Sequence, residues 1–384
     1  MKGGIDLKQL VLGAQSIYTG KGSLEVLKNI PATRVFIATG GSSMLKSGVI
    51  AKIQEYFSVN ECEIFVYSGI AKNPDVQTVL DGLEKMQEFA PDVVVAVGGG
   101  SPIDAAKVIT LLYEYPEITF DNILQIELPT KRRGIKFIAI PSTSGTGSEV
   151  TKSAVVTFKE QDLKIGLKTT YFVPDIAILD PLLTMTMPAE LVAETGMDAM
   201  THAVESYLNK NSDEFTTALA VGAIEGIFEY LPASYHEKTV ESREKVHSYQ
   251  CLAGIAFANS GLGMVHGIAH ALGGKYNMGH GLLNAIVLPY ALQFDVEHDE
   301  AIKIQLDTLA RKVGKADLIS SIIRLKETLQ IPVGLKAAGI TLEQLEDDMD
   351  QLVDNSLKGS TVGNPVPINH EEMKVLLRRI FEGE

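Results

Sequence analysis

The stretch DVVVAVGGGSPIDAAKVI, residues 92–109, places a continuous apolar run before three glycines and a segment of helical character. Because the run is apolar on both faces, it predicts a strand buried inside a parallel sheet. Ser101 and Pro102 suit the N-cap and the first position of the following helix. The free amides of such a helix start, approached across glycines, favour a bound phosphate over a simple turn. The stretch therefore predicts a strand, an anion-binding loop and a helix.

Similar runs lie on both sides of this stretch, and amphipathic segments such as residues 76–90 separate several of them. Strands that alternate with helices indicate a mainly parallel sheet with helices on both faces. In such sheets ligands bind at the carboxyl ends of the strands. The other strand-like runs are RVFIAT (34–39), CEIFVYSG (62–69), IKFIAIPST (135–143) and DIAILDP (175–181).

The pattern changes after Pro181, where helical periodicity replaces the strand-like runs. We therefore predict two domains. The first, residues 1–182, is an α/β dinucleotide-binding domain with a parallel sheet, and the second, residues 183–384, is all-α. Within the second, residues 299–353 are charge-rich amphipathic helix, which is typical of a solvated face.

The chain of 384 residues carries a formal net charge of -14. Such a surface repels nucleic acid and anionic lipid, so we expect neither as a partner. No apolar run approaches the ~18 residues of a membrane span. The two cysteines, Cys62 and Cys251, lie far apart and form no CxxC motif, which favours a reducing compartment and a cytoplasmic location.

Two further loops are rich in small and hydroxyl residues. IPSTSGTGSEVT (140–151) offers amides and hydroxyls to a nucleotide, although the sequence lacks the spaced GxGxxG fingerprint with its downstream acid. In ATGGSSMLKSG (38–48), Gly40, Gly41 and Ser42 stand where an acid would bind a ribose 2′-hydroxyl and repel a 2′-phosphate. We therefore predict a dinucleotide cofactor, NADP(H) in preference to NAD(H), with a flexible turn as the alternative.

An acid and a histidine share one helix face in TGMDAMTHAVESY (195–207), where Asp198 precedes His202 by four residues. A lone pair at this spacing is usually a surface ion pair. Here the intervening residues are apolar, and burial of an unpaired carboxylate among them is unfavourable. A metal ion would satisfy both groups, so the pair indicates half of a metal site.

Three of the eight histidines fall in GLGMVHGIAHALGGKYNMGHG (261–281). His266 and His270 repeat the spacing of four, and His280 follows across a glycine turn. One carboxylate and three imidazoles suit iron(II), zinc, cobalt or nickel. Spacing leaves open whether His266 or His270 completes the set, and satisfied core histidines are the alternative. The remaining histidines lie in polar contexts and are expected to be ordinary surface residues: His236, His247, His298 and His370.

The motifs GGGSPIDAAK (98–107) and IPSTSGTGSEVT, together with the two histidine segments, resemble the iron-dependent, group III alcohol dehydrogenases. That family belongs to a wider dehydroquinate synthase-like superfamily. The likeness extends over essentially the whole chain. It implies a nucleotide-binding α/β domain joined to an all-α metal-binding domain, with catalysis in the cleft, and a homodimer or higher homo-oligomer.

Position by position, the resemblance implies a role for individual residues. His270 would relay a proton or position the substrate, and Phe257 would face the substrate pocket. Many relatives have aspartate at the position of Gly40, so the resemblance also supports NADP(H). The metal ligands would be Asp198, His202, His266 and His280. The cofactor contacts would be Gly99, Gly100 and Ser101 at the pyrophosphate, Ser142, Thr143, Ser144 and Thr146 along the cofactor, and Asn73, Asp104 and Lys164 elsewhere.

These features predict a metal-dependent, NAD(P)-linked alcohol dehydrogenase or aldehyde reductase that holds iron(II), or zinc or another divalent metal. Hydride would pass between nicotinamide and a small primary alcohol or aldehyde, while the metal polarises the substrate oxygen. A lyase or cyclase of the dehydroquinate synthase type would need a cluster of Lys and Arg, which the sequence lacks around these histidines. A non-catalytic metal or nucleotide sensor would need an output domain, and no segment resembles one.

Overall fold

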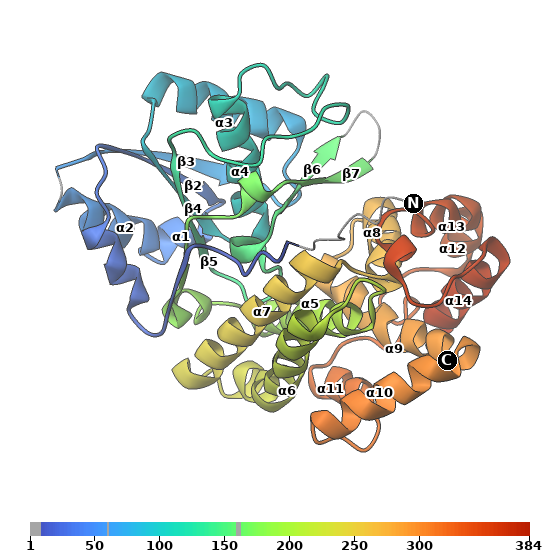
Figure 1. The fold of residues 1–384 in the computed structure, drawn as a ribbon. Coiled ribbons are helices and arrows are strands. Elements are labelled where there is room, and N and C mark those ends of the chain that lie inside the picture. The colour runs from blue at the N-terminus through green and yellow to red at the C-terminus, as the bar shows by residue number, and fades with distance from the viewer. Residues whose placement is uncertain (1–8, 60, 159–162) are drawn as a thin grey trace, which may run out of the picture.

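The computed structural model describes residues 9–59, 61–158 and 163–384, which form a sheet-containing half and a helical half (Figure 1). Six strands form one sheet in the order β1-β8-β5-β4-β2-β3, and every pairing in it is parallel. The predicted parallel sheet is thereby confirmed. The strands are β1 (Ser16–Thr19), β2 (Arg34–Gly40), β3 (Glu63–Ile70), β4 (Val93–Gly98), β5 (Lys136–Pro141) and β8 (Ile176–Leu179).

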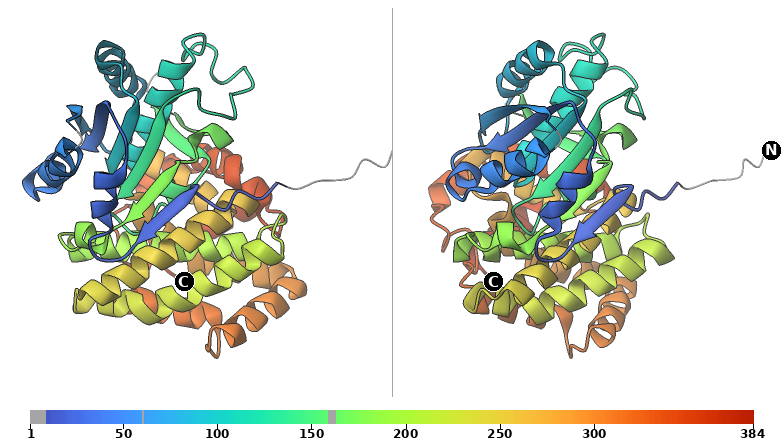
Figure 2. Two further views of the ribbon diagram at one scale, coloured as in Figure 1. Left: turned by 60° about the vertical axis from the view of Figure 1, so that its left-hand side comes forward. Right: turned by 90° about the vertical axis from the view of Figure 1, so that its left-hand side faces the viewer.

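Alternate side chains of the central strands enter two different apolar cores. Val35 and Val95 pack with η1 and α2 on one face, whereas Phe36 and Ala96 pack with α3 and α4 on the other. Because both faces are buried, these strands are continuous apolar runs instead of alternating ones. Figure 2 shows the helices on either side of the sheet. The elements are η1 (Ser23–Asn29), α1 (Ser43–Lys46), α2 (Val49–Ser58), α3 (Val76–Phe89) and α4 (Gly100–Glu114).

The helix α4 begins two residues earlier than the sequence predicted. Its N-cap is Gly99, so the prediction that Ser101 caps the helix is wrong. Ser101 and Pro102 lie inside the first turn instead. A proline is tolerated there because the first N–H groups of a helix have no intrahelical acceptor.

Three strands have no counterpart among the predicted runs. The edge strand β1 has four residues, none of them buried, and pairs with β8 beside α7 (Figure 2). A second sheet consists of two antiparallel strands, so not every strand pairing is parallel. Short or half-exposed strands lack the continuous apolar run that marks the central ones. The antiparallel strands are β6 (Ser153–Phe158) and β7 (Leu163–Lys168).

Every regular element after β8 in the described part of the chain is a helix, which confirms the predicted all-α half. The segment 299–353 forms four helices, α10 to α13, and Gly314 (φ 67°) follows the first of them. No single described helix is long and apolar enough to cross a membrane. The helices α7 and α8, which meet at a bend of 101°, would together be long and apolar enough, judged by length and composition alone. The helices are α5 (Ala189–Leu208), α6 (Glu214–His236), α7 (Val240–Ser260), α8 (Met264–Tyr276), α9 (His280–His298), α10 (Glu300–Lys312), α11 (Leu318–Thr328), α12 (Leu342–Asp347), α13 (Met349–Ser356) and α14 (His370–Glu382). Short 3-10 helices are η2 (Ser148–Val150), η4 (Thr170–Phe172), η5 (Pro181–Thr184) and η6 (Gly359–Gly363).

Candidate active site

Two of the predicted cofactor loops lie against each other at the carboxyl ends of β4 and β5. Gly98 has a φ of 146°, a conformation that glycine adopts far more readily than other residues. A Cβ atom on Gly100 would lie 2.9 Å from Cγ2 of Thr146, and one on Gly99 would lie 3.4 Å from Oγ1 of Thr143. Glycine therefore allows the loop after β4 to approach the hydroxyl-rich loop after β5.

Other predicted cofactor residues lie at the same edge of the sheet. The N–H of Asn73 donates to Oγ of Ser101 at 3.3 Å, and Asn73 has a left-handed backbone (φ 55°), which asparagine tolerates. Gly40 is the last residue of β2, and the exposed Gly41 and Ser42 follow it directly. The structure thus brings the three predicted loops to one edge.

Asp104 joins α4 to the segment around β6. Its carboxylate accepts hydrogen bonds from Oγ of Ser148 and, at 3.0 Å, from the N–H of Val155. Burial raises the pKa of this carboxyl, while the nearby ammonium of Lys107 acts in the opposite direction. These hydrogen bonds give Asp104 a structural role beside the predicted cofactor loops.

Ser144 and His247 are both buried, and Oγ of Ser144 lies 2.9 Å from Nδ1 of His247. The expectation that His247 is an ordinary surface residue is therefore wrong. Charged neighbours in the sequence suggested exposure, but this position faces the interior side of α7. Burial lowers the pKa of His247 to about 4, so its ring is neutral near neutral pH. Of the other histidines in polar contexts, His236 and His298 are exposed and His370 is partly buried.

The four residues expected to bind the metal converge from three helices. The Nε2 atoms of His202, His266 and His280 lie 3.8, 3.8 and 3.7 Å from Oδ1 of Asp198. In a tetrahedral site with bonds of about 2.0–2.2 Å, donor atoms are about 3.3–3.6 Å apart, so these distances are slightly longer than those of an occupied site. The ligand atoms of Asp198, His202 and His266 all lie within 4.8 Å of one another, whereas His280 is close to Asp198 but outside this compact group. Asp198, His202 and His266 are buried, whereas 39% of the His280 side chain is exposed. The cluster therefore has one open side.

His270 lies beside this cluster. Its ring stacks on that of His280, with centroids 5.0 Å apart, and lies 6.0 Å from the ring of His266. Desolvation of the ring by its neighbours and repulsion from the nearby imidazoles lower the pKa of His270 well below its usual value, although the residue as a whole is exposed. The charge of Lys164, on β7, acts on His270 in the same direction. Of the two histidines that spacing left open, His266 is the one that faces Asp198.

The cluster of Asp198 and the three histidines also adjoins the predicted cofactor loops. Nδ1 of His202 lies 3.2 Å from the carbonyl oxygen of Gly145 and donates to it, which leaves Nε2 for the cluster. Phe257 stacks on His202 with ring centroids 4.3 Å apart. A Cβ atom on Gly147 would lie 3.6 Å from Cε1 of Phe257. The expected substrate-pocket residue thus lies between the cluster and the loop after β5.

Known proteins resemble this chain in sequence and in overall fold. The family model for iron-containing alcohol dehydrogenase matches residues 14–181, and the model for the C-terminal part of the Fe-containing alcohol dehydrogenase family matches residues 192–381. An NADPH-dependent butanol dehydrogenase of Clostridium saccharobutylicum is 41% identical, over 96% of this chain and 97% of its own length. The chain belongs to the iron-containing alcohol dehydrogenase family.

Further relatives agree on fold and activity. A 1-propanol dehydrogenase of Citrobacter freundii is 38% identical over 75% of this chain and 74% of its own length. The structure of an iron-containing alcohol dehydrogenase from Thermococcus thioreducens has a TM-score of 0.90 at 32% identity, covering 98% of this chain and 100% of that one. The chain is therefore a metal-dependent alcohol dehydrogenase, as the sequence predicted, and the lyase and sensor alternatives are not supported.

The charges within the cluster of this alcohol dehydrogenase suit a divalent cation. Burial acts to raise the pKa of Asp198, but three neighbouring imidazoles and the amide of Asn284 outweigh it, and the pKa is lowered. Burial also lowers the pKa of His202, and it lowers that of His266 further. At neutral pH the site therefore offers one carboxylate and the neutral imidazoles of His202 and His266, the protonation states that metal ligands require.

Glu205 is a residue of the site that the sequence analysis missed. It is fully buried, and its Oε2 lies 2.5 Å from Nδ1 of His266 while its Oε1 accepts from the N–H of Val265 at 2.7 Å. A carboxylate on Nδ1 fixes the ring and directs Nε2 toward a metal. Burial raises the pKa of Glu205 to about 7, against the nearby backbone N–H groups. The signal was its position three residues after His202, on the same face of α5.

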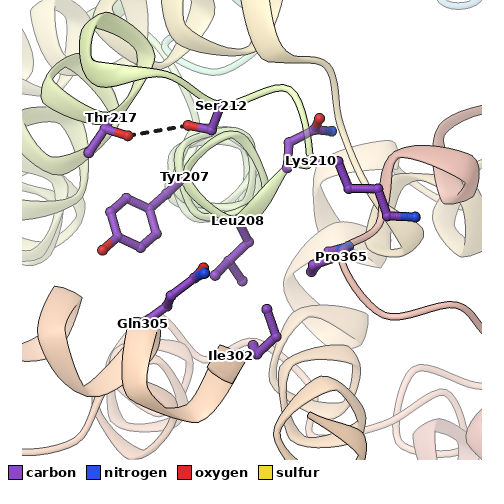
Figure 3. Close-up of a pocket in the computed structure, with 9 residues that line it drawn as sticks. Tyr207, Leu208, Lys210, Ser212, Thr217, Ile302, Gln305 and Pro365 are labelled. Atoms are coloured by element: carbon purple, nitrogen blue, oxygen red, sulfur yellow. Dashed lines mark hydrogen bonds between the residues drawn. The ribbon is translucent and has the colours of Figure 1, made fainter. Parts of the chain in front are cut away.

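A separate hollow of about 420 Å³ lies between the end of α5 and α10 of this dehydrogenase (Figure 3). Its lining has no imidazole, carboxylate or thiol among the described residues, so it lacks the usual ligands of a divalent transition metal. The lining residues are Tyr207, Leu208, Asn209, Lys210, Ser212, Thr217, Ile302, Gln305 and Pro365.

Proposed function

We propose that this alcohol dehydrogenase interconverts small primary alcohols and aldehydes at a divalent metal held by one carboxylate and three imidazoles. The observation that supports it best is the convergence of three Nε2 atoms within 3.8 Å of one carboxylate oxygen, directly beside the nucleotide loops. The family and the donor set favour iron(II), with zinc or another divalent ion as the alternative. The proposed ligands are Asp198, His202, His266 and His280.

A divalent ion at this site would supply the Lewis acidity that polarises the substrate oxygen, and nicotinamide would supply the hydride. The protein's own residues bind and orient the reactants. Phe257 would form an apolar wall beside His202, and the loops after β2, β4 and β5 would hold the nucleotide through their amides and hydroxyls. His270, kept neutral by its lowered pKa, can donate from one ring nitrogen and accept at the other, which suits a proton relay.

Purified protein, loaded with iron(II) without oxygen, is expected to consume NADPH when it is given small aldehydes. The absorbance of the reduced nicotinamide reports the reaction, with zinc-loaded and cobalt-loaded protein as parallel samples. A sensor would bind metal and nucleotide without turnover. If a broad panel of aldehydes, and of alcohols with NADP in the reverse direction, gives no turnover with any of these metals, the proposed activity is wrong.

We also propose that NADP(H) is preferred over NAD(H). The support is the absence of an acid at Gly40, with Gly41 and Ser42 after it, and the NADPH-dependent relative. Gly99, Gly100 and Ser101 would hold the pyrophosphate. The other proposed contacts are Asn73, Asp104, Ser142, Thr143, Ser144, Thr146 and Lys164.

Gly40→Asp is expected to shift the ratio of kcat/KM for NADPH to that for NADH toward NADH. The new carboxylate would repel a 2′-phosphate and accept from a 2′-hydroxyl, and one hydrogen bond to a charged group changes the ratio by roughly 10–100-fold, or ~1.5–3 kcal/mol. Ser58→Asp, at the far end of α2, introduces the same charge away from the loop as a control. An unchanged ratio in Gly40→Asp would contradict the assignment of this loop.

The proposal also covers the domain boundary, the cellular location and the oligomeric state. We propose a boundary between residues 182 and 183, within the segment of η5 that joins β8 to α5. Two free cysteines, Cys62 and Cys251, support a reducing, cytoplasmic location. A homodimer or higher homo-oligomer is expected, and light scattering on the purified chain tests it.

A further inference from the structure

The carboxamide of Asn284 lies among the proposed metal ligands. Asn284 is on α9, four residues after His280, and is fully buried. Its Nδ2 atom lies 2.7 Å from Oδ1 of Asp198 and 3.1 Å from Nε2 of both His266 and His280. One amide nitrogen therefore contacts donor atoms from α5, α8 and α9.

The contact atoms on Asp198 and His266 are suited to accept hydrogen bonds from this amide. Oδ1 of Asp198 is a carboxyl oxygen, and Nε2 of His266 carries a lone pair when its Nδ1 donates to Glu205. Such atoms repel one another when they converge. An amide nitrogen is a neutral donor with two hydrogens, so it can bridge two such atoms at a time. Exchanging the amide oxygen and nitrogen of Asn284 would place a further acceptor against Asp198 and His266, so the network fixes the orientation.

The other end of the same amide has no comparable role. Oδ1 of Asn284 is buried and has no hydrogen-bond partner within the described ranges of the chain. Buried polar atoms in proteins are normally paired. The amide therefore leaves its own acceptor unsatisfied while its donor bridges the ligands, which indicates that the residue serves the ligand cluster.

We propose that Asn284 is a positioning residue that holds Asp198, His266 and His280 in the geometry a divalent ion needs, before the ion binds. This inference rests on the metal site of the proposed function. An ion held by these ligands would occupy the imidazole lone pairs, and the shortest of the three contacts, the 2.7 Å one with Asp198, would remain for the amide. Because the ligands are already ordered, less conformational freedom is lost on binding, and Asn284 raises metal affinity.

Asn284→Leu, which keeps the size of the side chain and removes the donor, tests this role with cobalt(II) as the probe. Chelator competition is expected to show a cobalt Kd about 10–100-fold weaker than that of the unaltered protein, the usual effect of losing a group that orients metal ligands. The visible spectrum of the bound cobalt should change, because it reports ligand geometry. Affinity for NADPH should not change.

The matched control is Asn259→Leu. The Asn259 carboxamide bonds to the backbone of Val11 and Ile255 and contacts none of the proposed ligands. This variant is expected to bind cobalt with the unaltered affinity and spectrum. If Asn284→Leu protein folds and binds cobalt with the unaltered affinity and spectrum, the proposal is wrong. If Asn284→Leu protein binds cobalt more tightly than the unaltered protein, the proposal is also wrong, because the amide would then compete with the metal.

A second variant covers the case in which Asn284→Leu does not fold. Asn284→Asp keeps the shape and puts a carboxylate where the amide faces Asp198. It is expected to lower the Tm of the metal-free protein and to enlarge the rise in Tm when cobalt is added. If cobalt raises the Tm of Asn284→Asp protein by no more than it raises that of the unaltered protein, the proposed placement of Asn284 is wrong. If the unaltered protein binds no cobalt, the metal site of the proposed function is wrong, and this outcome is distinct from a failure of Asn284 alone.

Discussion

His280→Ala is expected to lower kcat by roughly 10³-fold or more, because metal-ion catalysis contributes several kcal/mol to stabilising the transition state. His280 is the first residue of α9, and 39% of its side chain is exposed, so its removal leaves the helical core intact. Metal content, measured by elemental analysis, should fall with kcat. Affinity for NADPH should persist, because the nucleotide loops belong to the sheet half.

His298→Ala is the matched control for this experiment. His298 is the last residue of the same helix, is exposed, and bonds through Nδ1 to the carbonyl oxygen of Phe294 at 2.8 Å. Its replacement is expected to leave metal content and kcat unchanged. His280→Ala protein with full metal content and full activity would remove His280 from the proposed ligands. Equal losses of metal and nucleotide would contradict the division of the site between the two halves.

The central sheet could be predicted because burial of its strands on both faces leaves a clear pattern in the local sequence. Val93 to Val97 are buried on both faces, and a strand in that environment has to be continuously apolar. The edge strand β1 and the pair β6 and β7 are short or half-exposed, so their sequences do not differ clearly from those of loops. Their pairing depends on contacts with distant segments, such as that of Ser16 with Ile176.

The candidate site was predictable where its geometry is local. Spacing of four residues places Asp198 with His202, and His266 with His270, on one face of a helix. Whether His266 or His270 faces the carboxylate depends on the position of α8 relative to α5. The spacing of residues along the chain carries no information about that position. Glu205 likewise has the right spacing from His202, but its partner, His266, lies on another helix.

His247 shows the reverse error. Its charged neighbours along the chain suggested a surface position, yet the side chain is buried against Ser144 from the sheet half. A helix such as α7, which packs against both the helical core and the nucleotide loops, is buried over much of its circumference, so local polarity is a poor guide to burial.

A buried cation supports the loops that would carry the nucleotide. Lys107, on α4, is 1% exposed, and its ammonium contacts five oxygen atoms of the segment 148–153. The carboxylates of Asp104 and Glu149 lie near enough to act on its pKa. A buried charge of this kind is tolerated only when it is paired and hydrogen-bonded. The contacts are with both oxygens of Ser148, both of Thr151 and the carbonyl oxygen of Ser153.

Lys107→Met is therefore expected to lower the free energy of unfolding by about 3–5 kcal/mol, because it leaves buried carboxylates without their counter-charge and buried oxygens without a donor. Urea denaturation at neutral pH measures the loss, and Lys85→Met on the exposed side of α3 should change it by no more than about 0.5 kcal/mol.

The loss caused by Lys107→Met should also depend on pH. Burial lowers the pKa of Lys107 from 10.5 to about 8, so between these values the unfolded chain binds the proton and the folded chain does not. Unfolding then takes up protons, and the contribution of Lys107 to stability rises with pH across this window. The variant lacks this contribution, so the difference between the two proteins should widen from about pH 8 toward pH 10. Equal stability of the two proteins at neutral pH, or a difference that narrows across the window, would show that Lys107 does not hold the loop in this way.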